Sequence, residues 1–157
     1  MSQSLAKNYL HLIFSTKDRR PSIPAVLREE LHAYIGGICN DLDSPLIAIH
    51  SLADHLHLLF VLNKNLALSR ALQQIKGGSS RWMSQQATLR PETMAHLRDF
   101  AWQGGYGAFS IGESNIEAVC KYIAQQPVHH QKVSFQDEFR KILQRYKIAF
   151  DERWVWD

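Results

Sequence analysis

Two histidines are separated by a single residue in a segment that reads Asp-His-Leu-His-Leu-Leu-Phe-Val. The apolar content predicts a β-strand, and side chains two residues apart on a strand point to the same face. His55 and His57 then share one face, while Leu56, Leu58 and Phe60 face the core. Two neighbouring imidazoles form a metal clamp that needs one or two further ligands. The alternative is a half-exposed strand with two solvated histidines.

A phenol and a carboxamide lie together on a later segment that predicts a helix. The sequence Ser-Asn-Ile-Glu at residues 114–117 has the pattern of a capping box, which would start this helix. Its core side is expected to consist of Ile116, Val119, Cys120 and Ile123. Tyr122 and Gln126 are four residues apart, so they share one edge of the helix beside that apolar side. The alternative is an amphipathic edge tyrosine with a polar neighbour.

The remaining hydrophobic patterns predict the elements that position these groups. Strands are expected at 9–15, 46–52 and 55–62, and on both sides of the glycine-rich segment 104–107. Helices are expected at about 24–42, 66–86 and 135–147. The order β-α-β-β-α-β predicts an α+β protein with a ferredoxin-like split βαβ sheet. Its helices would cover one face, and the other, open face would carry the histidines.

Composition narrows the class of protein. The chain has 157 residues, 45% of them hydrophobic, which predicts one compact domain over residues 1–157. No apolar stretch is long enough to span a bilayer, and the first residues lack the apolar segment of a secretory signal. Cys39 and Cys120 are a single pair, which fits a reduced cytoplasm better than a disulfide framework.

Positive charge is segregated along the chain although the net charge is only +3. Residues 55–91 contain no aspartate or glutamate, and a second basic cluster follows the first apolar run. Segregated positive charge predicts a surface that binds a polyanion such as a nucleic acid. The candidate phosphate contacts are Lys17, Arg19, Arg20, Arg70, Lys76 and Arg81. Each of them is alternatively an ordinary solvated residue.

Two helical glycines, Gly77 and Gly78, predict a close approach by another helix or by a ligand strand.

The two motifs together resemble the single-tyrosine transposases of the HUH endonuclease superfamily. This family comprises small transposases of bacterial insertion sequences and their relatives associated with repetitive palindromic (REP) elements. His-Leu-His on a strand, followed by Tyr-x-x-x-Gln on a helix, is carried here by His55, His57, Tyr122 and Gln126. The resemblance runs in order through residues 12–21, 53–59, 72–82, 102–109 and 122–126.

The resemblance implies a metal-dependent transposase that cuts and rejoins single-stranded DNA at the hairpin-bearing ends of a mobile element. His55, His57 and Gln126 would hold a divalent cation, Mg²⁺ or Mn²⁺ by the family expectation, although nitrogen ligands suit manganese or zinc better. Tyr122 would be the nucleophile that forms a 5′-phosphotyrosine. The family further implies a homodimer in which the tyrosine helix of one subunit completes the other's histidine site. A cytoplasmic, nucleoid-associated protein is expected.

Several residues leave alternatives open. Pro127 disfavours helical conformation at Gln126, so the helix is expected to bend or end there. His129 and His130 would replace Gln126 as ligands if the chain turned back, and are otherwise surface histidines. Tyr106, between glycines, is a second candidate nucleophile whose setting better fits a turn or stacking on a base.

The activity also has alternatives on the same fold. The first is a non-catalytic protein that binds single-stranded or hairpin nucleic acid. The second is a metal-dependent hydrolase in which water attacks the phosphodiester and no protein–DNA adduct forms.

Overall fold

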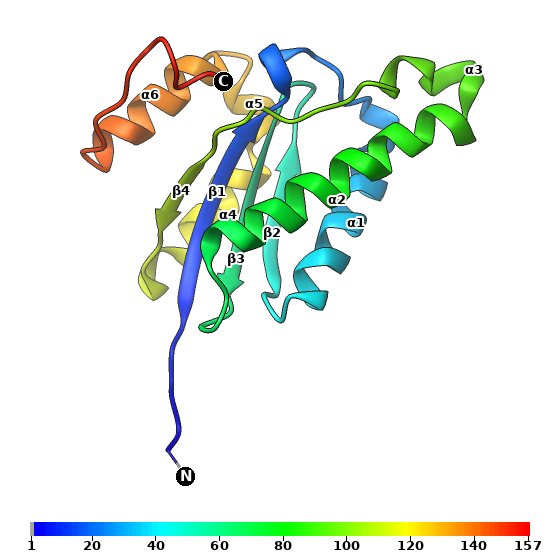
Figure 1. Ribbon diagram of the computed structural model, residues 1–157. Helices are drawn as coiled ribbons and strands as arrows, with labels where there is room; N and C mark the ends of the chain where they lie inside the picture. The colour runs from blue at the N-terminus through cyan, green and yellow to red at the C-terminus, as the bar shows by residue number, and fades with distance from the viewer. Residues whose placement is uncertain (1) are drawn as a thin grey trace.

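A four-stranded antiparallel sheet organises the chain (Figure 1), for which a computed structural model describes residues 2–157. The strands are β1 (Asn8–Ser15), β2 (Leu46–Ser51), β3 (His55–Leu62) and β4 (Gly107–Ser110). Their order across the sheet is β2-β3-β1-β4, and every neighbouring pair is antiparallel. This order confirms the predicted α+β fold with split βαβ connections.

Two helices pack on one face of the sheet, as predicted. They are α1 (Arg28–Asp41), preceded by a 3₁₀ turn at Ala25–Leu27, and α2 (Leu68–Leu89). Alternate residues of the two central strands face them, and these include Leu12, Phe14, Leu56, Leu58 and Phe60. All five side chains are fully buried against the helices, so this layer is the main hydrophobic core.

The opposite face of the sheet is not open. The helices α4 (Ile116–Ala124), α5 (Gln126–His129) and α6 (Phe135–Arg145) cover it (Figure 1). A second apolar cluster lies beneath α6 and contains Ile13, Phe109, Phe135, Phe139 and Leu143. The sheet contributes apolar side chains to this face as well, and their burial favours a covering layer. The histidine strand is therefore enclosed on both sides.

Two local predictions are wrong. Residues 100–103 form no strand, because Trp102 makes a single isolated bridge to Thr16 and turns its indole inward to donate to Ser79 Oγ at 2.9 Å.

The expected capping box is also absent within the described residues 2–157. Ser114 lies inside a 3₁₀ turn, Glu113–Asn115, and Asn115 precedes α4 without a side-chain cap hydrogen bond. A short helix, α3 (Pro91–Met94), and a 3₁₀ turn follow α2.

The helical glycines mark where α1 and α2 approach each other. A Cβ atom built on Gly78 would lie 2.8 Å from Ile38 Cδ1 of α1, whereas one on Gly77 would meet only Arg81 Nη1, at 3.7 Å. A side chain at position 78 would therefore displace Ile38, which favours helix packing, the first of the two explanations that the sequence left open. Among residues 2–157, no helix is both long and apolar enough to cross a membrane.

The neighbouring glycines provide a matched pair of variants. Gly77→Ala should stabilise the protein by roughly 0.5–1 kcal/mol, because it lowers the backbone entropy cost of the helix without a clash. Gly78→Ala should destabilise it by about 1 kcal/mol, because the added methyl group would lie against Ile38 of α1. Urea unfolding followed by circular dichroism measures both free energies. Equal effects of the two variants would contradict the assignment.

Candidate active site

His55 is the first residue of β3, and its ring is oriented by the residue before it. Its Nδ1 lies 2.6 Å from Asp54 Oδ1, so the ring donates this N–H to the carboxylate. The proton is thereby held on Nδ1, and Nε2 keeps a lone pair directed into the site. The His55 Nε2 atom lies 3.1 Å from Nε2 of His130, and the His55 ring is buried. Asp54 therefore prepares His55 as a ligand.

His57 lies on the same face of β3 and is oriented by a third histidine. Its Nδ1 is 3.0 Å from Nε2 of His11 on β1. Burial lowers the pKa of His11 to about 4 and that of His57 well below its usual value, so both rings are neutral at pH 7. With the shared proton on His57 Nδ1, the Nε2 atom of His57 presents a lone pair. This buried Nε2 has no hydrogen-bond partner within residues 2–157.

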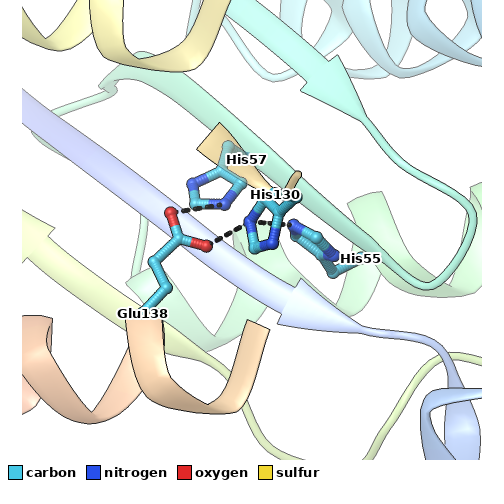
Figure 2. Close-up of side chains that lie close together, drawn as sticks. All are labelled: His55, His57, His130 and Glu138. Atoms are coloured by element: carbon cyan, nitrogen blue, oxygen red, sulfur yellow. Dashed lines mark hydrogen bonds and ion pairs between the residues drawn. The ribbon is translucent and has the colours of Figure 1, made fainter. Parts of the chain in front are cut away.

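Glu138 brings a carboxylate from α6 to these imidazoles (Figure 2). Its Oε1 lies 3.5 Å from Nε2 of His57, and its Oε2 lies 2.5 Å from Nε2 of His130. The second contact lacks hydrogen-bond geometry. Glu138 is 3% exposed, and this burial, helped by the charge of Asp54, raises its pKa to about 8. The raised pKa means that the neutral carboxyl group predominates at pH 7 without a cation, and a bound cation would shift Glu138 to its charged form.

The donor atoms fit a divalent cation. One atom from each of His55, His57, His130 and Glu138 lies within 4.8 Å of all the others. Three imidazole nitrogens and one carboxylate oxygen form a set that suits zinc or manganese better than magnesium. The unpartnered Nε2 of His57 supports the fit, because buried polar atoms are almost always satisfied. The structure thus assembles a group of residues that could bind a metal.

Gln126 lies beside these candidate metal ligands, although the helix breaks before it. The helix α4 ends at Ala124, and Gln126 begins α5 with Pro127 in its first turn, so the predicted break occurs. Gln126 is fully buried, and its Nε2 donates to Glu138 Oε1 at 3.0 Å. Its Oε1 has no hydrogen-bond partner in the part of the chain that the structure describes. This free amide oxygen is a further candidate ligand.

Tyr122 reaches the same carboxylate from α4. Its hydroxyl donates to Glu138 Oε1, and its ring centroid lies 5.8 Å from that of His57 and 6.1 Å from that of His11. The phenol thus lies beside the histidines of its own chain. The structure brings Tyr122, Gln126, His55 and His57 together within one chain, whereas the resemblance implied a tyrosine helix supplied by a second subunit.

The candidate phosphate contacts divide into two groups. Lys17, Arg19 and Arg20 follow β1 at the end of the sheet where Thr16 N donates to Asp54 O, beside the start of β3. Arg70, Lys76 and Arg81 lie on α2, across the sheet from the histidines.

Lys76 donates to the carbonyls of Gly104 and Gly105 at 3.0 and 2.9 Å, and burial lowers its pKa to about 8. Lys76 therefore holds the glycine-rich loop.

Three site residues were not assigned from the sequence. His11 and Glu138 were not considered, and His130 was expected at the surface unless the chain turned back. The chain does turn back after α5, which leaves the His130 side chain only 11% exposed. Glu138 did have a signal, because it falls among the apolar positions of α6 between Phe135 and Phe139.

Two solved structures share the fold of this chain. A structure of a REP-associated tyrosine transposase bound to a REP hairpin has a TM-score of 0.60 at 19% identity, covering 85% of this chain and 76% of the other. A Deinococcus radiodurans R1 protein assigned as a transposase gives 0.59 at 22% identity, covering 80% of this chain and 98% of the other. These identities support similarity of fold alone.

No curated protein matches the sequence significantly. The family model described as IS200-like transposase matches residues 4–126, a range that contains both strand histidines, Tyr122 and Gln126. That match spans most of the 157-residue chain, and the fold and the clustered side chains are consistent with it. The chain therefore belongs to the IS200-like transposase family.

Proposed function

We propose that this transposase cuts and rejoins single-stranded DNA by transesterification through Tyr122. One observation carries the proposal: the Tyr122 hydroxyl, His57 and Gln126 converge on Glu138 within one chain. His55 belongs to the same group of donor atoms. A phenol beside a cation-binding cluster is the arrangement that phosphotyrosine chemistry needs.

The residues of the chain account for the proton and the bonds. Tyr122 Oη attacks the phosphorus, and its proton passes to Glu138 Oε1, which already accepts its hydrogen bond. The bond between phosphorus and the 3′ oxygen breaks, and this oxygen leaves as a 3′-hydroxyl after taking up a proton. The product is a 5′-phosphotyrosine. Because the covalent link retains the phosphodiester energy, a 3′-hydroxyl can reverse the step and rejoin DNA without a nucleoside triphosphate.

His55, His57 and Gln126 would hold the divalent cation, and His130 and Glu138 offer two further donors. A bound cation neutralises charge on the scissile phosphate and orients it for in-line attack. This support matters because an unperturbed phenol has a pKa near 10 and is a weak nucleophile at pH 7. Mg²⁺ and Mn²⁺ are both proposed, and the imidazole-rich donor set favours Mn²⁺.

The proposed substrate is single-stranded DNA that carries hairpins at the ends of a mobile element. The structural similarity to a transposase bound to a REP hairpin supports this proposal. The proposed phosphate contacts include Lys17, Arg19 and Arg20, which follow β1 beside the start of β3. A homodimer remains a prediction. Tyr122 lies beside His57 of its own chain, which supports attack by the phenol of the same copy.

The covalent intermediate provides the direct test. The protein should form a gel-stable adduct with labelled single-stranded oligonucleotides from the DNA flanking its gene, in Mn²⁺ or Mg²⁺. Tyr122→Phe and chelation by EDTA should each abolish the adduct, while Tyr106→Phe should retain it. Cleavage without any adduct would instead identify a hydrolase, and binding without cleavage would identify a nucleic-acid-binding protein.

The orientation of His55 by Asp54 predicts a change in metal affinity. Asp54→Asn should weaken Mn²⁺ binding about 10- to 100-fold, because the ring loses the carboxylate that fixes its tautomer. Isothermal titration calorimetry with Mn²⁺ measures this affinity without DNA. Asp41→Asn, at the exposed end of α1, removes the same charge and should bind Mn²⁺ like the wild type. Equal affinities of all three proteins would exclude the proposed role of Asp54.

A further inference from the structure

A cavity of about 460 Å³ opens beside the tyrosine, between β4, α4 and α6. Its volume is within the range of small-molecule sites. Tyr122 and Glu138 form part of its wall, so a molecule in the cavity contacts the phenol and the carboxylate that we place in the reaction. The metal cluster and the proposed phosphate contacts after β1 do not account for this space.

The walls of the cavity suit a flat, apolar group. Val119 of α4 and Ile142 of α6 face it from the two helices. Tyr146 lies at its edge, with its ring 4.8 Å from that of Phe109 and 39% of the residue exposed. An exposed aromatic ring with a fixed position is a surface on which a nucleic-acid base can stack.

Two cations on α6 give the cavity a positive rim. Lys141 and Arg145 both line it, one helical turn apart, and neither forms an ion pair with a carboxylate in residues 2–157. Arg140 on the same helix differs, because it pairs with Glu152 and Asp137. Like charges at this spacing repel each other, and an anion between them would relieve the repulsion.

We infer that this cavity binds the nucleotide that adjoins the scissile phosphate of single-stranded DNA. The base stacks on Tyr146, and the backbone phosphates contact Lys141 and Arg145. A base paired within a duplex is stacked on its neighbours and could not enter a pocket between two helices, so the ligand is an unpaired nucleotide. The inference rests on the proposed function and identifies the face from which DNA approaches Tyr122.

Binding measurements on a protein that cannot form an adduct test the cationic rim. In a Tyr122→Phe background, Lys141→Ala with Arg145→Ala should weaken binding of a labelled mixed-sequence oligonucleotide of about 12 nucleotides by roughly 10-fold. The slope of log affinity against log salt should become shallower by about 1.4, since each phosphate contact on a single strand contributes about 0.7.

The matched control removes one lysine and one arginine elsewhere. Arg98→Ala with Lys132→Ala changes the net charge equally, at exposed positions that do not line the cavity. It should bind DNA within about 2-fold of the parent, because long-range effects of exposed charges are screened by salt. Thermal unfolding verifies that both double variants are folded. Equal losses in the two double variants would overturn the inference.

Photocrosslinking locates the base independently. A homothymidine strand substituted with 5-iodouracil, irradiated on the Tyr122→Phe protein, should attach to Tyr146, as mapped by mass spectrometry of peptides. Crosslinks found exclusively outside the cavity would overturn the inference. The two proposals fail separately. If Lys141→Ala with Arg145→Ala in a protein that keeps Tyr122 forms the adduct at the wild-type rate, the cavity has no role in the reaction. Binding and crosslinking without any wild-type adduct would retain the cavity and reject phosphotyrosine chemistry.

Discussion

A single buried carboxylate joins the elements that build the site. Burying a carboxylate is costly unless donors or a cation compensate it. Glu138 meets this requirement in part with a phenol from α4 and an amide from α5. A cation held with the imidazoles of β3 and of the turn after α5 would supply the rest. The neighbouring Phe135 and Phe139 bury α6 against the sheet, and this packing brings the carboxylate inside. The site is therefore complete only when α6 is packed against the sheet.

The sequence predicted the parts of this site that depend on local geometry. The faces of His55 and His57 follow from the two-residue repeat of a strand, and the proximity of Tyr122 and Gln126 follows from a separation of four residues. The order of strands and the two helices behind the sheet followed from hydrophobic period and short connections. The break at Gln126 was also predicted, because Pro127 acts on the residue next to it.

The remaining features depend on contacts between distant residues. His11 lies 46 positions before His57, and Glu138 lies 81 positions after it, so no local pattern links them. The face thought to be open is closed by α6, whose apolar side matches Ile13 and Phe109 on the sheet. Glu138 and His130 also fall outside residues 4–126, so the family match does not include them.

The alternation of β3 also limits how this strand can change length. Its histidine face meets the polar cluster, and its leucine face meets the aliphatic layer under α1 and α2. Inserting or deleting one residue would exchange these faces and place imidazoles among aliphatic side chains, with leucines turned to Glu138. A change of one residue that kept both surfaces correct would need a β-bulge, and the pairing of β2 with β3 already contains a register shift between Leu46 and Ala48. A change of two residues would preserve the alternation without one.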